Sequence, residues 1–98
     1  MKDYSKMSDF EINKAVSTAL GMDVSGATEE NNIMYGYVPD ICSNTSDAMP
    51  ILIENRISLT WVNGECRASS VKAGYHEFSC GNALRAAMIV YLMMKDVE

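Results

Sequence analysis

The pattern of apolar residues predicts a helix near each end of the chain. Residues 8–11, Ser-Asp-Phe-Glu, match a capping box, in which the Ser and Glu side chains satisfy free N–H groups of the first turn. Apolar residues then recur at helical spacing as far as position 20, and Gly21 is suited to end that helix. The second helix follows Asn82, a favourable N-cap residue, and runs to about residue 94.

The apolar surface of the helix predicted at residues 83–94 extends most of the way around it. Arg85 is the only charged residue in this stretch. A membrane-spanning helix needs about 20 apolar residues, so a run this short predicts a helix buried inside a protein. A helix that is apolar nearly all round is buried on more than one side. Either the sheet and first helix of the same chain cover it, or a second subunit does.

A β-hairpin is predicted between these two helices. Residues 57–62 alternate in the manner of a strand, Asn63-Gly64 favours a type I′ turn, and residues 65–70 form the returning strand. A further short strand is predicted at residues 75–78. The sequence therefore contains an antiparallel sheet.

Three more segments precede the hairpin. Residues 25–32 are polar and turn-prone, which predicts a loop. Residues 33–38 are predicted to form a strand, which Pro39 either ends or places at the edge of the sheet. A helix is predicted at residues 46–55, with Pro50 in its first turn, where the missing N–H is not needed. The order of elements predicts an α+β fold in a single domain of residues 1–98: a small antiparallel sheet packed against two to three helices.

The charge and residue inventory disfavour several classes of function. The chain has 98 residues and a net charge of −5, and its eight Lys and Arg form no basic cluster, so DNA or RNA binding is not expected. Three cysteines without a CxxC pair, and one histidine, predict neither a zinc site nor a cofactor. The N-terminal segment has no apolar signal stretch. We therefore expect a cytosolic protein with reduced thiols and no membrane association.

The candidates for catalysis have simpler interpretations. His76 and Cys80 would form a Cys–His dyad if a turn brought them together, but a histidine at or near the surface is the simpler interpretation. Asp47 and Glu54 are seven residues apart and could share a helix face, yet helix capping and solvation explain them equally well. We therefore predict that the protein is not an enzyme.

Three blocks of sequence together carry a family resemblance: "YSKMSDFEINKAVSTALG", "DICSNTSDAMPILIENRISL" and "NALRAAMIVYLMM". In this order, over about half the chain, they are similar to the NinX-like proteins of lambdoid bacteriophages. Family members tend to carry Trp where Met49 stands and Pro where Ala83 stands. The first departure removes an aromatic ring that could stack on a ligand. The resemblance implies a phage or prophage origin and a small accessory protein, and it implies no activity.

Polar residues at the starts of two predicted helices are candidates for binding an anion, because free N–H groups there suit phosphate or carboxylate oxygens. These candidates are Asn44, Asp47, Asn82 and Arg85. The helix dipole disfavours a cation in a first turn, so Arg85 is expected to have an anionic partner. That partner is either a ligand or a carboxylate of this chain, namely Asp40, Asp47 or Glu54.

Aromatic residues form the second group of binding candidates. Tyr35, Tyr37 and Trp61 could stack on a base or another flat ring, although packing on the sheet explains them as well.

The resemblance and these candidates lead to a functional hypothesis. We expect a homo-oligomeric phage protein of the host cytoplasm that binds a nucleotide-like small molecule without catalysis. It would counter host defence by sequestering a nucleotide-type signalling molecule. The alternative is a protein-binding inhibitor or adaptor that acts on a host enzyme through its acidic face. A hydrolase using His76 and Cys80 is a third possibility.

Overall fold

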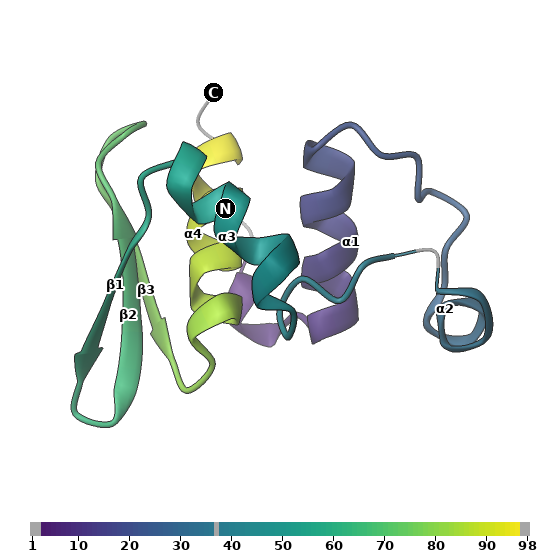
Figure 1. The fold of residues 1–98 in the computed structure, drawn as a ribbon, viewed down its shortest axis with the longest axis horizontal. Coiled ribbons are helices and arrows are strands. Elements are labelled where there is room, and N and C mark those ends of the chain that lie inside the picture. Colours follow the sequence, from purple (N-terminus) through teal and green to yellow (C-terminus); the bar gives the residue numbers. More distant parts are fainter. Residues whose placement is uncertain (1–2, 37, 97–98) are drawn as a thin grey trace.

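The computed structural model describes residues 3–36 and 38–96 and confirms an α+β fold. Its elements in chain order are the 3-10 helix η1 (Tyr4–Lys6), α1 (Asp9–Ala19), α2 (Glu29–Tyr35), α3 (Thr45–Glu54), β1 (Ser58–Val62), β2 (Glu65–Ser70), β3 (His76–Cys80) and α4 (Ala83–Asp96). The three strands form one antiparallel sheet in the order β1-β2-β3. Figure 1 shows α4, α1 and α3 on the same side of this sheet.

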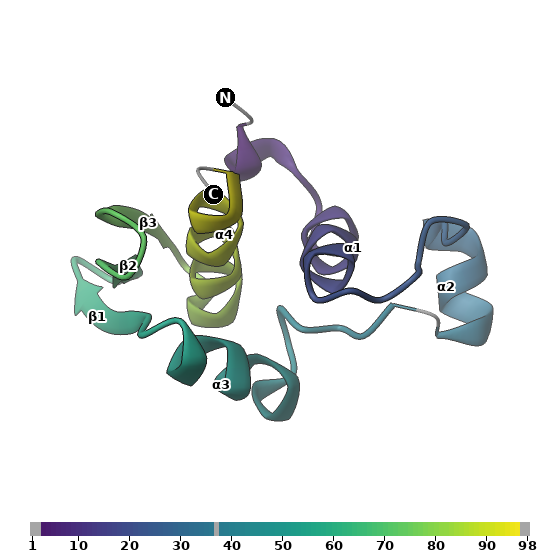
Figure 2. The same ribbon diagram turned by 90° about the horizontal axis from the view of Figure 1, so that it is seen from above.

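Helix α4 lies at the centre of the fold. Figure 2 shows it between the sheet and α1, with α3 beside it. Every residue from 86 to 92 is buried, and so is Met94. Elements of the same chain provide this cover, so the burial of α4 requires no second subunit. Among the residues described, no helix is long and apolar enough to cross a membrane.

Helix α1 begins as its sequence predicts. The Glu11 N–H donates to the Ser8 hydroxyl over 3.1 Å, and the Ser8 N–H donates to the Glu11 carboxylate over 3.0 Å. Ile12 and Val16 are fully buried in the core that α1 shares with α4. The capping box thus fixes the first turn of α1, which carries Asp9, against the central helix.

The predictions for residues 25–38 are partly wrong, because residues 33–35 of the strand expected at 33–38 belong to the helix α2 (Glu29–Tyr35). A second capping box starts it: Thr28 accepts the N–H of Asn31, whose side chain accepts the N–H of Thr28. Gly36 ends it in the left-handed conformation, with φ of 65°. The predicted loop therefore contains the start of a helix. Tyr35 belongs to α2, and Tyr37 lies outside the described residues.

Helix α3 begins at Thr45, one residue earlier than predicted, and Pro50 lies inside it. The prediction that Pro50 belongs to the first turn is wrong, because either start leaves position 50 beyond that turn. Proline supplies no N–H, and the carbonyl of Ser46 thereby loses the donor that position 50 would provide. Ser46 is exposed, so water can bond to that carbonyl instead. The cap at Asn44 holds the helix start in place through a 3.0 Å hydrogen bond from the Ser46 N–H.

The predicted hairpin is confirmed. Asn63 and Gly64 have φ of 52° and 83°, the two positive values that a type I′ turn requires. The turn pairs Val62 with Glu65. The third strand, predicted at residues 75–78, is β3 at His76–Cys80.

The inner face of the sheet is covered unequally. Leu59 pairs with Ala68 and Trp61 pairs with Cys66, so all four side chains point to the side that α4 occupies. Ala68 and Cys66 are fully buried, whereas Leu59 is 38% exposed and Trp61 is 66% exposed. Helix α4 thus covers β2 and leaves much of β1 open.

Candidate functional site

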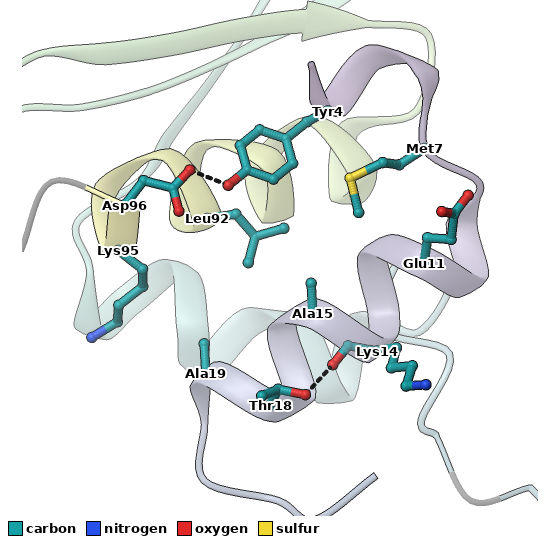
Figure 3. A pocket seen from close by; sticks show the side chains of 10 residues that line it. All are labelled: Tyr4, Met7, Glu11, Lys14, Ala15, Thr18, Ala19, Leu92, Lys95 and Asp96. Atoms are coloured by element: carbon teal, nitrogen blue, oxygen red, sulfur yellow. Dashed lines mark hydrogen bonds between the residues drawn. The ribbon is translucent and has the colours of Figure 1, made fainter. Parts of the chain in front are cut away.

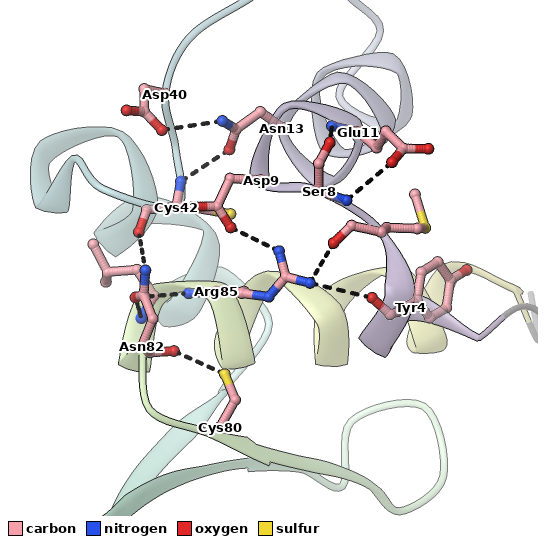
Figure 4. A network of polar contacts seen from close by, with 12 residues as sticks. Tyr4, Ser8, Asp9, Glu11, Asn13, Asp40, Cys42, Cys80, Asn82 and Arg85 are labelled. Carbon is pink, nitrogen blue, oxygen red and sulfur yellow. Dashed lines mark hydrogen bonds and ion pairs between the residues drawn. The ribbon is translucent and has the colours of Figure 1, made fainter.

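Arg85 is bound within the chain. Its guanidinium contacts the Asp9 carboxylate at 2.6 Å and donates to the backbone carbonyls of Met7 and Tyr4. Its side chain is only 17% exposed. The sequence analysis correctly includes a carboxylate of this chain as a possible partner of Arg85. However, the three carboxylates that it considers, Asp40, Asp47 and Glu54, are not the partner. The partner is Asp9, in the first turn of α1 (Figure 4).

Asn82 also has a structural role. Its side-chain oxygen accepts the N–H groups of Leu84 and Arg85, at 3.0 and 3.2 Å, and so caps α4. Its side-chain nitrogen donates to the Cys42 carbonyl over 3.0 Å. Asn13, which the sequence does not single out, completes the network by accepting the Cys42 N–H and donating to Asp40. Figure 4 shows that these contacts join α1, α4 and the segment before α3.

The four polar candidates lie at the starts of two helices, as the sequence predicts. Asn44 and Asp47 lie at the start of α3, where Asn44 caps the helix and both side chains are exposed. Asn82 and Arg85 lie at the start of α4. The hydrogen bond from Asn82 to the Cys42 carbonyl links the start of α4 to the segment that leads into α3.

The structure does not bring His76 and Cys80 together as a Cys–His dyad would require. His76 and Cys80 occupy the two ends of β3, which places them about 13 Å apart at the usual rise of a strand. The His76 Nε2 atom contacts the Ala73 carbonyl at 3.0 Å, and the Cys80 thiol donates to the Asn82 carbonyl over 3.2 Å. Burial raises the pKa of the Cys42 thiol to about 12, so this thiol stays protonated at neutral pH. Within residues 3–36 and 38–96, no group of three or more His, Cys, Asp or Glu is placed to hold a metal ion.

The aromatic candidate Trp61 is exposed to solvent. It lies on the uncovered inner face of β1, and the exposed apolar side chains of Met49 and Ile53 belong to the neighbouring α3. Between α3 and β1 lies a groove of about 540 Å³, which we call the α3–β1 groove. It is lined by Met49, Leu52, Ile53, Arg56, Ile57, Ser58 and Leu59.

Arg56 is a site residue that the sequence analysis does not identify. It follows α3 in the left-handed conformation, with φ of 54°, where glycine is the usual residue. The Arg56 N–H bonds to Ile53, and the Ile57 N–H bonds to the Leu52 carbonyl, the pattern of a Schellman motif. Arg56 is exposed, and among the described residues it has no ion pair. Its side chain is the only charged one among the residues that line the α3–β1 groove.

A second groove, of about 460 Å³, lies between α1 and α4 (Figure 3). Its polar groups are engaged with one another or with backbone. The Tyr4 hydroxyl donates to the Asp96 carboxylate, and Lys14 donates to the Ala27 carbonyl over 2.7 Å. Burial, together with Asp96, raises the pKa of Tyr4. Glu11 and Asp96 are matched in this groove by Lys14 and Lys95, so its lining offers no net positive charge to an anion.

A third groove, of about 410 Å³, is lined by Ser8, Asp9, Phe10, Asn13, Glu29, Asn32 and Asp40. Its three carboxylates also disfavour an anion. The α3–β1 groove is thus better suited to a negatively charged ligand than the other two.

Comparison with known proteins gives one match. The family model described as "Bacteriophage P22, NinX" matches residues 3–95, which is nearly the whole chain. No curated protein and no solved structure matches the chain.

Proposed function

The chain belongs to the bacteriophage P22 NinX family, and we propose that it is a phage accessory protein that binds a nucleotide-type small molecule without altering it. By sequestering such a signalling molecule in the host cytoplasm, it would deprive a host defence system of its messenger. The proposed action involves neither DNA nor RNA.

The observation that carries this proposal is Arg56 at the α3–β1 groove. A guanidinium binds phosphate oxygens through several N–H groups at once, and this one has no carboxylate partner in the part of the chain described. The remaining lining is mostly apolar, and a volume of about 540 Å³ lies within the range of small-molecule sites. Trp61 lies two residues beyond Leu59 on the same face of β1, outside the groove lining, and its exposed ring is a flat surface suited to a base.

The conformation of Arg56 adds a second argument. A residue with a Cβ loses about 1 kcal/mol in the left-handed region relative to glycine. Glycine at this position would therefore favour the fold. A strained, exposed arginine beside a groove is consistent with a side chain retained for binding.

Catalysis is not part of the proposal because the reactive side chains are engaged elsewhere. His76 and Cys80 each contact a backbone carbonyl, and the Cys42 thiol is buried. A sequestering protein needs only affinity for its ligand.

The test is to titrate the purified protein with cyclic GMP–AMP and, separately, with cyclic ADP-ribose. Isothermal titration calorimetry measures the affinity for each probe. Native mass spectrometry of the mixtures reports the mass of the retained ligand. We expect one of these probes to bind and to be recovered unaltered after denaturation. Recovery of a hydrolysed product would contradict the proposal, and so would absence of binding by both probes.

A protein-binding adaptor is the second candidate, and the exposure of Ile53 favours it. This side chain is 70% exposed and shares the α3–β1 groove with Met49 and Leu59, and adjoining exposed apolar residues are typical of protein interfaces. The two candidates predict different sensitivities in a phage infection assay. An adaptor should lose function in Ile53→Glu and keep it in Arg56→Gly, whereas a sequestering protein should lose function in Arg56→Gly.

A further inference from the structure

We propose that the β1 edge pairs with the β1 edge of a second copy of this chain, antiparallel about a twofold axis at Thr60. In this dimer the partner's Trp61 completes the α3–β1 groove. The interface itself rests on the geometry of β1, and only the ligand in the completed groove rests on the proposed function.

The backbone of β1 has an open edge. In a two-residue hairpin, the residues that flank the turn form a hydrogen-bonded pair, and such pairs alternate along the two strands. Ser58, Thr60 and Val62 therefore direct their N–H and C=O groups toward β2. Leu59 and Trp61 direct theirs away from it, to the edge that no other strand occupies.

Nothing in the sequence of β1 protects that edge. Natural edge strands are usually blocked by a charged residue, a proline or a bulge, because unpaired strands associate. Residues 57–62, Ile-Ser-Leu-Thr-Trp-Val, contain no charge and no proline, and their pairing with β2 is regular. A free, uncharged edge beside exposed apolar side chains is suited to pairing with another strand.

The register follows from β1 itself. Strand β1 has five residues, Ser58–Val62, with Thr60 at its centre. All five can pair with the antiparallel β1 of a second copy only when Thr60 lies opposite the partner's Thr60. Leu59 then lies opposite the partner's Trp61, and both have outward-facing backbone groups, so the two symmetric pairs form four main-chain hydrogen bonds. Their side chains also share one face, which brings the apolar surfaces of the two copies together.

The charges at the two ends of the hairpin complement each other in this arrangement. Arg56 precedes β1, and Glu65 follows the turn at the other end of the hairpin. Both are exposed, and neither has an ion pair among the described residues. Antiparallel pairing brings Arg56 to the end where the partner's Glu65 lies. Since a guanidinium carries five N–H donors, Arg56 can contact this carboxylate and an anionic ligand together.

The dimer completes the groove. The residues that line it in one copy include no aromatic residue, and Leu59 lies at its β1 side. The partner's Trp61, placed opposite Leu59, supplies a ring there. Pairing would reduce the exposure of Trp61, which is 66% in a single chain, and each dimer would contain two equivalent composite sites.

The first test compares two lysine variants by sedimentation velocity at micromolar concentrations. Trp61→Lys adds a charge to the β1 edge, and Ser79→Lys adds the same charge to an exposed position on the edge strand β3. We expect the wild type and Ser79→Lys to form dimers, and Trp61→Lys to raise the dimer Kd by ~30-fold or more, as for a buried interface tryptophan. A monomeric wild type would overturn the proposal, and so would equal dimerisation of the two variants.

Cysteine cross-linking tests the register. In a Cys80→Ser background, which removes the half-buried thiol, Thr60→Cys should form a disulfide-linked dimer when oxidised glutathione accepts the electrons. The matched Ser58→Cys variant should not, because position 58 faces position 62 of the partner. Cross-linking of Ser58→Cys to the same extent would overturn the register.

Titration of the cross-linked dimer with cyclic GMP–AMP and cyclic ADP-ribose separates the two proposals. A dimer that binds neither probe would leave the interface standing and refute the proposed function. Binding by a monomeric wild type would support the function and overturn the composite site.

Discussion

Arg85 and Arg56 lie at the ends of two helices. Comparison of their surroundings distinguishes an arginine that stabilises the fold from one that is accessible to a ligand. Arg85, at the start of α4, has one carboxylate and two carbonyls as partners and is mostly buried. Arg56, after the end of α3, is exposed in a strained conformation beside an apolar groove. An arginine that is already satisfied holds elements together, whereas one without a partner is available to a ligand.

Removal of the Arg85 guanidinium should give the largest effect. Arg85→Met keeps an unbranched side chain and removes the contacts to Asp9 and Met7 that join α4 to the N-terminal segment. We expect the free energy of unfolding, measured by urea denaturation, to fall by ~2–4 kcal/mol.

Arg67→Met is the matched control for that change. Arg67 pairs with Glu77 at 3.6 Å, and both side chains are nearly half exposed. Solvent screening limits such a pair to about 0–1 kcal/mol. If Arg85→Met and Arg67→Met lose the same free energy of unfolding, the contacts of Arg85 do not contribute more to stability than an exposed ion pair.

The contrast between the arginines also shows what the sequence can predict. Because the helix dipole disfavours a cation in a first turn, the sequence correctly predicts that Arg85 has an anionic partner. However, Asp9 is 76 positions away, and only the packing of α1 against α4 brings it close. The sequence gives no comparable signal for Arg56, because its importance comes from a positive φ and a groove that exist only in the folded chain.

The same distinction applies to the secondary structure. Local signals predict the Ser8 capping box and the Asn63-Gly64 turn correctly, because each is determined by adjacent residues. Between Thr28 and Gly36 the local signals are present but depart from the usual residue types, and the predicted loop and strand miss them. Asn31 replaces the usual Glu or Gln of a capping box, and Gly36 is a helix cap rather than a residue within a strand.

High pH should weaken the region around Arg85. Burial raises the pKa of Cys42 from 9.0 to about 12, so the unfolded chain releases this proton at lower pH than the folded one. The stabilisation is complete below pH 9.0 and is lost as the pH rises toward 12, by up to ~1.4 kcal/mol per pH unit. The raised pKa of Tyr4 acts in the same direction above its ordinary value of 10.0.

Urea denaturation over a series of pH values measures this loss. The control is Cys42→Ala, whose stability should depend less steeply on pH. An unchanged slope would show that Cys42 does not contribute.

Arg56→Gly should have two effects of opposite sign. Glycine adopts a φ of 54° without strain, so thermal or urea unfolding should show a gain of ~1 kcal/mol. The affinity for the nucleotide probe should fall at least ~10-fold, which corresponds to ~1.4 kcal/mol of lost charge-assisted hydrogen bonding. Arg56→Lys, which keeps the charge but not the planar fork, should bind with intermediate affinity. If Arg56→Gly binds the probe as tightly as the wild type, the α3–β1 groove is not the site.

The smallest effect on stability is expected for variants of Asn44. These variants test whether Asn44 caps α3 only or also binds a ligand. Asn44→Ala removes the acceptor for the Ser46 N–H and should cost ~0.5–1 kcal/mol of unfolding free energy. Asn44→Ser restores a capping hydroxyl and should recover most of that loss. Because Asn44 does not line the α3–β1 groove, both variants should bind the nucleotide probe with wild-type affinity in calorimetry. A loss of affinity shared by both variants would instead assign the ligand to the start of α3, since the cap is retained in one of them.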